Sequence, residues 1–388
     1  MRRYIILAAA VFMQMCLGAT YSWAVFVRPL KEITGLLQGT LQSPFSIFYF
    51  VFPLTLIFSD RILRWLGPRK ASLLGGILFG GGWILASLGN HTFAFTAAGV
   101  GVLSGVGVGT VYLVPVTVGL AWFPEHKGLV TGITVAGFGG GAALFSQVAG
   151  WGMASAGISP YTMFLYLGIG YILIISLCGL TMVNPPDVKI KETIPLNYTV
   201  ILKSKLFRAL CLAMFAGLAA GLTVNANMKE LTPLVSVKTG IMAVAFFAVA
   251  NAIGRVIWGL IFDRIPPERA IQANLLSQAI VLTCSPFLLH SPAGLEVFAF
   301  LTGFNYGGIL VLYASTIARV WGIERVSQVY GLLFSVHLIA TFSPMAAGYA
   351  YDFTGSFTLP FVALVLLLLL ATGVIQWNRK FFATQSTG

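Results

Sequence analysis

Long apolar segments follow one another through almost the whole chain of 388 residues. A helix needs about 20 mostly apolar residues to cross a bilayer, and the segments here end at charges or at Gly and Pro turns. The sequence therefore predicts an all-α polytopic membrane protein with twelve transmembrane helices and short connections. The predicted limits of these helices are 5–27, 42–58, 72–90, 94–121, 128–153, 160–183, 206–228, 240–262, 271–289, 294–318, 327–351 and 357–377.

The composition agrees with a membrane protein and excludes several other classes. Only 9% of the residues are charged and 58% are hydrophobic, whereas an average soluble domain has roughly 25% charged residues. So few charges cannot cover the surface of a soluble fold of this size, which excludes an ordinary cytosolic enzyme. The four cysteines lie inside apolar segments without metal-ligand spacing, and we expect neither a metal nor a cofactor.

A polar stretch at 184–205 divides the chain into two halves with matching landmarks. The tripeptide Asp-Arg-Ile follows the second predicted span, at Asp60, and follows the eighth, at Asp263. We therefore expect an N-terminal six-helix bundle over 1–183, a cytoplasmic linker over 184–205 and a C-terminal six-helix bundle over 206–388. Transporters built from such repeats hold their substrate near the bilayer midplane, between the repeats.

The basic residues predict the orientation of the chain. If the N-terminus is cytoplasmic, eighteen of the 23 basic residues lie in cytoplasmic segments and only four lie in outer segments. Because Lys and Arg accumulate on the cytoplasmic side of membrane proteins, we expect both termini in the cytoplasm. The net charge of +12 then reflects topology. We expect no nucleic-acid partner, since the basic residues form no face with interleaved aromatic residues.

Several motifs resemble those of the major facilitator superfamily. The loop after the second predicted span contains the residues of its Asp-Arg…Gly-x-Arg-Lys signature, namely Asp60, Arg61, Gly67, Arg69 and Lys70. Three further stretches, CLGATYSWAVF, WFPEHKGLVTG and NAIGRVIWGLIFDR, resemble the oxalate/formate antiporter and monocarboxylate transporter branches, and the chain as a whole resembles bacterial proton-coupled lactate transporters. The resemblance covers essentially the full length and implies the major facilitator fold.

The resemblance also implies a cytoplasmic gating motif. In the superfamily, the loops with the signature help to hold the cytoplasmic side closed by pairing acidic residues with arginines and helix ends. Carried over to this sequence, the role falls on Asp60, Arg61, Arg69, Asp263 and Arg264. The alternative is that the arginines serve only to orient the protein in the membrane.

One basic residue, Arg255, lies in the middle of a predicted span, while all eleven acidic residues fall in loops or at helix ends. A charge at this depth costs from about 2.5 to above 10 kcal/mol and usually faces a wet cavity. An arginine guanidinium stays charged and binds a carboxylate through two parallel hydrogen bonds. The position therefore predicts that Arg255 binds the carboxylate of a substrate. Alternatively, its side chain extends to the nearby membrane surface or bonds to backbone carbonyls.

Departures from the family pattern favour a small monocarboxylate. The resemblance to the oxalate branch implies a lysine in the span at 327–351, where this chain has His337. Mammalian monocarboxylate carriers have an arginine in their eighth helix, which corresponds to Arg255, and an acidic residue four positions before it. This chain has Asn251 at that earlier position. Histidine has a reference pKa near 6.5, so His337 could bind the substrate or carry the coupled proton, with Arg255 as the other candidate for coupling. A further alternative is that substrate and proton travel together as the neutral acid.

Depth along the spans suggests further residues of a central site. Asn251 and Arg255 are one helical turn apart and share a face. Tyr112, Tyr306 and Phe334 lie near the midpoints of their spans, where tyrosines can bond a carboxylate and aromatic rings can wall a cavity. They could equally be packing residues between helices. Weaker candidates, whose helix faces the sequence does not define, are Gln14, Tyr21, Asn225 and Asn227.

These observations lead to one main functional hypothesis. The chain is expected to be a secondary active transporter of the cell inner membrane that carries a small monocarboxylate, such as L-lactate or pyruvate, in symport with protons by alternating access. We expect a functional monomer whose partners are the carboxylate, protons and the lipid bilayer. The alternative is an organic-anion exchanger of the oxalate/formate type. A membrane-embedded enzyme is disfavoured because the spans contain no Ser/His/Asp set, metal cluster or paired carboxylates, and we predict no catalytic residue.

Overall fold

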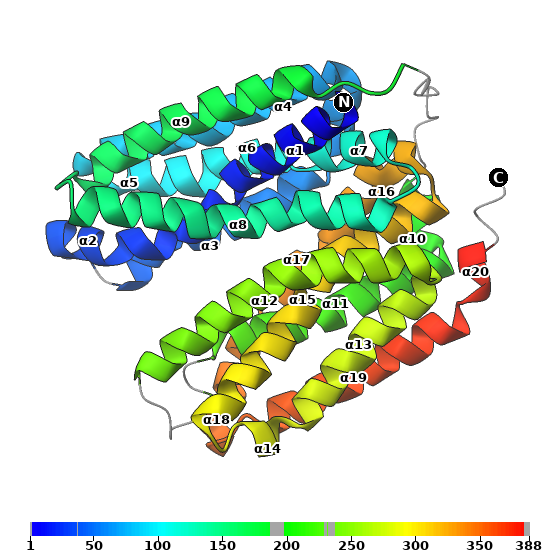
Figure 1. The fold of residues 1–388 in the computed structure, drawn as a ribbon. Helices are drawn as coiled ribbons and strands as arrows, with labels where there is room; N and C mark the ends of the chain where they lie inside the picture. Colours follow the sequence, from blue (N-terminus) through cyan, green and yellow to red (C-terminus); the bar gives the residue numbers. More distant parts are fainter. Residues whose placement is uncertain (1, 37, 187–197, 229–230, 232–236, 384–388) are drawn as a thin grey trace. The chain divides into compact units, whose positions relative to one another are not determined.

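The computed structural model describes residues 2–36, 38–186, 198–228, 231 and 237–383 (Figure 1). Helices make up almost all of this part of the chain, and no strand occurs in it. The predicted all-α class is confirmed. The helices of the first half are α1 (Arg2–Gly18), α2 (Ala24–Thr34), α3 (Gln38–Leu56), α4 (Ser59–Ala86), α5 (Phe93–Thr96), α6 (Ser104–Val111), α7 (Leu113–Trp122), α8 (Lys127–Ala154) and α9 (Pro160–Thr181).

The second half contains eleven further α-helices among the described residues. They are α10 (Tyr198–Lys203), α11 (Lys205–Ala226), α12 (Val237–Arg264), α13 (Pro267–Thr283), α14 (Ser285–Leu288), α15 (Pro292–Val320), α16 (Val326–Phe334), α17 (Val336–Ala340), α18 (Ser343–Thr354), α19 (Thr358–Trp377) and α20 (Lys380–Ala383). Short 3₁₀ turns occur at Ala19–Trp23, Ser87–Asn90 and Ile323–Arg325, and a π-helical turn occurs at Ala97–Leu103.

Contacts between these helices define two compact units. Unit 1 comprises Met1–Pro124 and Thr134–Lys189, and unit 2 comprises Glu125–Ile133 and Ile190–Gly388. Helix α8 therefore contributes its first residues to unit 2 and its remainder to unit 1. Of the predicted linker, residues 187–197 lie outside the described part of the chain, and α10 occupies much of the rest.

Ten helical segments in the described residues are long and apolar enough to cross a membrane. Two of the twelve predicted spans, 42–58 and 271–289, correspond to α3 and α13, which are not among the ten. Helix α3 has a shorter apolar part at Ser43–Leu56, and α13 has only 17 residues. The count of twelve spans and the cytoplasmic position of the termini stay predictions.

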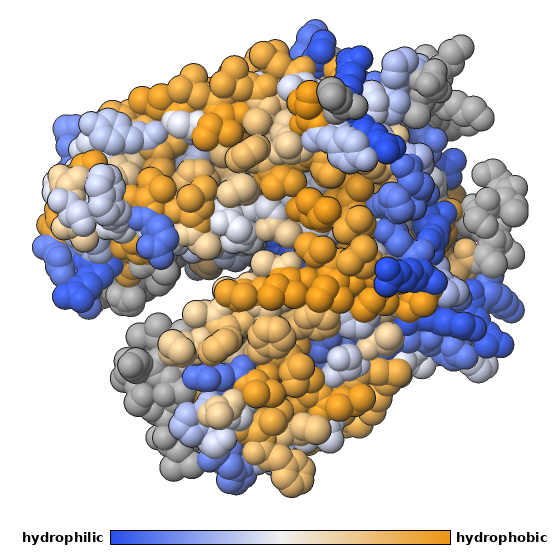
Figure 2. All heavy atoms as spheres, in the orientation of Figure 1, coloured by the Kyte–Doolittle hydropathy of each residue, from blue (hydrophilic) through white to orange (hydrophobic). Residues whose placement is uncertain are grey.

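The surface of each unit is that of a multi-pass membrane protein. Hydrophobic residues cover the sides of the helices, and hydrophilic residues gather at the helix ends (Figure 2). Large aromatic side chains are strongly exposed in the last turns of α8, α18 and α19, at Trp151, Phe353 and Trp377. Lipid replaces water around such apolar surfaces, and aromatic residues at helix ends are typical of the membrane interface.

Helices α12 and α15 form the most extensive helix pair among the described residues, and both belong to unit 2. Lipid tails are as apolar as the helix surfaces, so close packing in a membrane depends on small residues that bring backbones together. Helix α11 packs against α15, α17, α18 and α19, and α13 packs against α15 and α19. Both α11 and α13 thus pack on α15, and α15 in turn packs along α12, which contains Arg255.

Candidate functional site

Arg255 lies on α12 with its side chain only 4% exposed. Its Nε donates a hydrogen bond to Oδ1 of Asn251, one turn earlier, with the two atoms 2.9 Å apart. The two residues thus share a helix face, as their spacing predicts. The bond fixes the plane of the guanidinium, and a fixed plane is what bidentate recognition of a carboxylate requires.

Two glycines from different helices adjoin the backbone of α12 at Arg255. A methyl group on Gly307 of α15 would overlap with the carbonyl oxygen of Asn251, and one on Gly132 of α8 would overlap with the carbonyl oxygen of Arg255. Both contacts lie within unit 2. Only glycine allows backbones to approach so closely, so the turn that carries Arg255 is held between α15 and the beginning of α8.

Tyr306 joins the same region from α15. Its ring centroid lies 5.8 Å from that of Phe247, with the planes tilted by 36°, and the ring rests against Gly221 of α11. Phe247 precedes Asn251 by one turn of α12, so both lie on one stripe of that helix. We call Phe247, Asn251, Arg255 and Tyr306 the Arg255 group. The structure therefore brings together three predicted site residues and adds Phe247, which the sequence did not single out.

Phe334 and His337 form a second pair in unit 2. Their rings are stacked, with centroids 5.2 Å apart and planes at 6°, and His337 is 5% exposed. Phe334 also contacts Tyr330 at 5.7 Å between ring centroids. The helix is interrupted between them, since α16 ends at Phe334 and α17 begins at Val336. The stacked rings thus lie on either side of the interruption.

Tyr112 lies in unit 1, at the break between α6 and α7. The break agrees with Pro115, because proline cannot donate the helical hydrogen bond and displaces the carbonyl four residues before it. Nε2 of Gln14 donates to the backbone carbonyl of Tyr112 at 3.0 Å. The Tyr112 ring lies 5.7 Å from Phe138, which also contacts Tyr21 at 5.5 Å between ring centroids.

The tyrosines and Gln14 thus form a cluster within unit 1. Of the weaker candidates of the sequence, Gln14 and Tyr21 belong to this cluster. Asn227 has a different role, because its Nδ2 donates to the carbonyl of Thr223 at 2.8 Å, at the C-terminal end of α11. Asn225 is an exposed side chain near the same end.

Asp263 binds the beginning of α8. Its Oδ1 accepts from the backbone nitrogen of Gly128 at 2.7 Å, and its Oδ2 accepts from that of Leu129 at 2.9 Å. The first N–H groups of a helix have no partner within the helix and carry partial positive charge. A carboxylate on two of them is a charge-assisted cap, and all three residues belong to unit 2.

Two basic side chains nearby bind the C-terminal ends of helices. Nζ of Lys127 donates to the carbonyl of Ala318 in the last turn of α15 at 3.2 Å. Nη1 of Arg319 donates to the carbonyl of Ile265, directly after α12, at 3.2 Å, and its guanidinium lies 4.7 Å from the centroid of the Phe262 ring. Cations are favourable at the C-terminal ends of helices. The ends of α8, α12 and α15 are therefore linked by one acidic and two basic side chains.

The other residues of the predicted gating motif have more varied surroundings. Asp60 is buried and forms an ion pair with Arg64, one turn later, at 2.5 Å. Nε of Arg69 donates to the carbonyl of Leu180 near the end of α9, at 2.9 Å. Arg61 and Arg264 are exposed. A gating role for these residues stays a prediction.

Comparison with known proteins identifies the family. The family model described as the Major Facilitator Superfamily matches residues 7–342. The chain belongs to the Major Facilitator Superfamily. It is therefore a secondary transporter, and the resemblance of its motifs to this superfamily is confirmed.

Relatives and a solved structure of the superfamily agree with this assignment. The oxalate:formate antiporter of Oxalobacter formigenes is 24% identical over 387 residues, which cover 96% of this chain and 91% of that protein. Apicoplast pyruvate carrier 1 of Toxoplasma gondii is 25% identical, with 88% of this chain and 81% of that protein covered. The Major Facilitator Superfamily transporter FucP in the outward conformation is 14% identical and superposes with a TM-score of 0.74 over 97% of this chain and 99% of that one. The predicted major facilitator fold is confirmed.

Several residues near Arg255 and Asp263 were not predicted from the sequence to have a role there. Gly132 and Gly307 occur in glycine-rich segments, where nothing in the pattern shows which glycine contacts Arg255. Lys127 and Arg319 carry a weak signal, because basic residues near the end of a helix are favourable there. Their partners, however, belong to other helices, and no local pattern shows those contacts.

Proposed function

We propose that this facilitator carries a small monocarboxylate, such as L-lactate or pyruvate, in symport with protons across the cell inner membrane, as a monomer working by alternating access. The observation that carries the proposal is the buried guanidinium of Arg255, oriented by Asn251 in the middle of an apolar helix. Two of its relatives are named for anions of this kind, oxalate and formate in one case and pyruvate in the other.

The chemistry of the Arg255 group fits one carboxylate. A guanidinium has five N–H donors in a fixed plane, so a bond from Nε to Asn251 is compatible with two parallel bonds from the Nη edge to a carboxylate. Phe247 and Tyr306 would provide an apolar wall for the short carbon chain, and the Tyr306 hydroxyl could bond a substituent on it. One fixed cation in the group matches a monocarboxylate better than a dicarboxylate.

The other predicted residues complete the proposal. His337, stacked on Phe334, would accept the coupled proton or orient the substrate, because imidazole is the side chain that changes charge near neutral pH. Tyr112, near the middle of its span in unit 1, would be a further substrate contact. Asp60, Arg61, Arg69, Asp263 and Arg264 would control access from the cytoplasm.

A second candidate function is exchange of organic anions. It is favoured by the oxalate:formate antiporter, which aligns with 96% of this chain. Exchange and symport use the same carboxylate site and differ in what returns the empty transporter to its starting state. An exchanger needs a counter-anion for that step, whereas a symporter returns empty after it has released both the substrate and the proton.

Uptake of labelled L-lactate into proteoliposomes separates these possibilities. A symporter accumulates lactate when the pH is lower outside, with no anion inside, and Arg255→Gln should reduce this uptake at least tenfold. Arg28→Gln is the matched control, because Arg28 is a strongly exposed arginine that pairs only with its neighbour Glu32 in the described contacts. Uptake that ignores the proton gradient but requires formate or oxalate inside would favour exchange. Normal uptake by Arg255→Gln would contradict the carboxylate site itself.

A further inference from the structure

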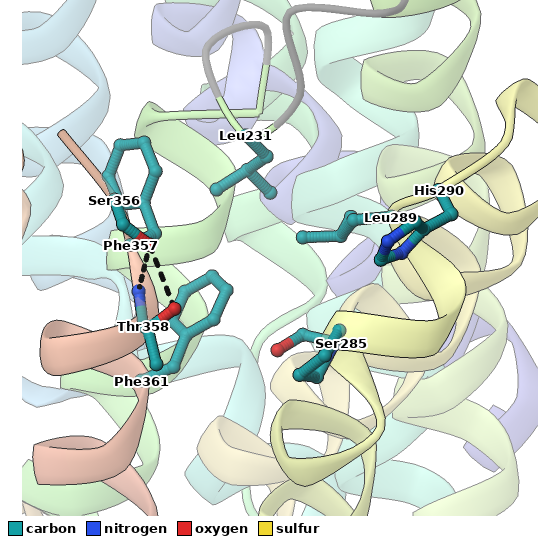
Figure 3. Close-up of a pocket in the computed structure, with 9 residues that line it drawn as sticks. Leu231, Ser285, Leu289, His290, Ser356, Phe357, Thr358 and Phe361 are labelled. Atoms are coloured by element: carbon teal, nitrogen blue, oxygen red, sulfur yellow. Dashed lines mark hydrogen bonds between the residues drawn. The ribbon is translucent and has the colours of Figure 1, made fainter.

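Unit 2 contains a cavity of about 310 Å³ between α14 and the beginning of α19 (Figure 3). Ser285, Leu289 and His290 form one wall, and Ser356, Phe357 and Phe361 form the opposite wall. The volume lies at the lower end of the roughly 300–1,000 Å³ that is typical of small-molecule sites. The cavity also has their usual composition, with apolar and aromatic walls and a few polar groups.

The cavity is separate from the Arg255 group. Helix α15 begins at Pro292, two residues after His290, and contacts the turn of Arg255 through Gly307. Fifteen residues of helix between these positions correspond to about 22 Å at 1.5 Å per residue. None of the described residues that line the cavity belongs to the Arg255 group.

The polar groups of the cavity are hydrogen-bond donors. Ser285 is 5% exposed, and its hydroxyl faces the cavity (Figure 3). On the opposite wall, Oγ of Ser356 accepts from the backbone nitrogen of Thr358 at 3.1 Å and lies 2.8 Å from the Thr358 hydroxyl. In the contact between the two hydroxyl groups, one of them donates its hydrogen to the other. The hydrogen of the second hydroxyl group can then be donated to a ligand. The imidazole of His290 extends toward the cavity from its rim.

The same groups discriminate between ligand charges. The described residues that line the cavity include one histidine and three hydroxyl side chains but no acidic residue. Among the described lining residues, an anion would therefore meet donors on both walls and no like charge. A cation would find no counter-charge among the same residues, and desolvation without a partner is unfavourable.

The apolar wall is rigid and aromatic. The Phe357 ring is stacked on Tyr351, with centroids 4.6 Å apart, and on Phe361, with centroids 6.0 Å apart. Both phenylalanines are largely buried, and their rings pack against each other, with the Phe357 ring also on Tyr351. Such a wall suits an aryl group or a branched alkyl group, and a three-carbon acid would fill only part of the volume.

We propose that this cavity is a second binding site, for an amphipathic organic anion of the aryl or branched-alkyl carboxylate class. Ser285, His290 and the Ser356–Thr358 pair bind the carboxylate, and Phe357 and Phe361 contact the hydrocarbon part. The site is independent of the proposed lactate transport, because it uses none of the residues assigned to that function.

Binding of phenylpyruvate to the purified full-length chain tests the site. Isothermal titration calorimetry is done in an Arg255→Gln background, which removes the guanidinium of the proposed transport site. We expect saturable binding in this background. Combining Ser285→Ala with His290→Ala should weaken it at least tenfold, and Leu289→Trp should abolish it by filling the cavity. His91→Ala, at an exposed histidine of unit 1, is the control and should not change the affinity.

Three results would overturn the proposal. One is no saturable binding to the Arg255→Gln protein, and another is equal affinity in the Ser285/His290 double variant and the His91→Ala control. The third is equal affinity for 3-phenylpropanol, which has the aryl group but no carboxylate, because the donors would then not recognise an anion. Thermal unfolding midpoints of all variants, measured without ligand, show whether a loss of binding reflects a loss of fold.

Discussion

Replacing Asp263 tests whether a charged cap holds the beginning of α8 in unit 2. The carboxylate accepts two backbone hydrogen bonds, at 2.7 Å and 2.9 Å, from Gly128 and Leu129. Asp263→Ala removes both bonds together with the negative charge at the helix N-terminus. Asp263→Asn keeps one acceptor oxygen and removes the charge, so the difference between the two variants measures the one hydrogen bond that Asn can keep.

The magnitude follows from the geometry and from the partial exposure of the site. Hydrogen bonds to charged groups contribute about 1.5–3 kcal/mol each, but loss of an N-cap costs only about 0.5–2 kcal/mol because water replaces part of the lost bonding. Asp263 is half-buried, so we expect a loss of about 2 kcal/mol for Asp263→Ala and about half of that for Asp263→Asn. For a unit of this size, 1 kcal/mol shifts the midpoint by about 2–4 °C, which predicts a decrease of about 4–8 °C for Asp263→Ala.

Thermal unfolding in detergent, followed with a thiol-reactive fluorophore, measures this shift. Cys16 is buried in unit 1, and Cys211 and Cys284 are half-buried in unit 2, so unfolding exposes thiols in both units. Arg264→Gln is the control, since Arg264 is the exposed neighbour of Asp263 and its loss should leave the midpoint nearly unchanged. Unfolding of Asp263→Ala at the same temperature as Arg264→Gln would show that no charged cap stabilises the beginning of α8.

Three further substitutions test other contacts by the same unfolding measurement. Gly307→Ala should cost about 1–3 kcal/mol of stability through overpacking against α12 and should reduce lactate uptake. Gly348→Ala in α18 is the control, because an added methyl group there meets no atom within 4 Å. Equal effects of the two substitutions would refute the close contact of Gly307 with α12. Gln14→Met should cost about 1 kcal/mol by removing a buried hydrogen bond to the carbonyl of Tyr112, and an unchanged midpoint would speak against that bond. Lys127→Met keeps the apolar stem but loses the bond to the end of α15, so a decrease of about 0.5 kcal/mol is expected, and a more stable variant would contradict it.

Hydropathy predicts where the chain crosses a membrane better than where its helices begin. The spans predicted at 160–183 and 294–318 agree closely with α9 and α15, at Pro160–Thr181 and Pro292–Val320. The span predicted to begin at 72 belongs to α4, which begins at Ser59. Charged residues such as Arg61 and Arg64 end an apolar run but are compatible with a helix. Residues 59–66 are therefore helical, but Gly67, with φ +72° and ψ +168°, interrupts the helix before the span begins.

Local spacing predicts contacts along one helix, and crossing geometry determines the rest. Asn251 and Arg255 lie four residues apart, and the hydrogen bond between them follows from the period of an α-helix. The contact of Tyr306 with Phe247 joins α15 to α12, and its register depends on how the two helices cross. Closely spaced glycines predict that such crossings exist, but several rotations of each helix satisfy the same sequence pattern.

The structure connects the Asp263 cap with Arg255 through a single helix pair. The beginning of α8 contacts α12 at two levels, where Gly128 meets Asp263 and where Gly132 meets the backbone of Arg255. Residues 255 and 263 are about 12 Å apart along α12 at 1.5 Å per residue. The first turns of α8 thus carry the charged cap at Gly128 and Leu129 and also contact the turn of α12 that carries the guanidinium. In this chain a residue of the predicted gating motif and the residue proposed to bind the carboxylate therefore contact the same short stretch of α8.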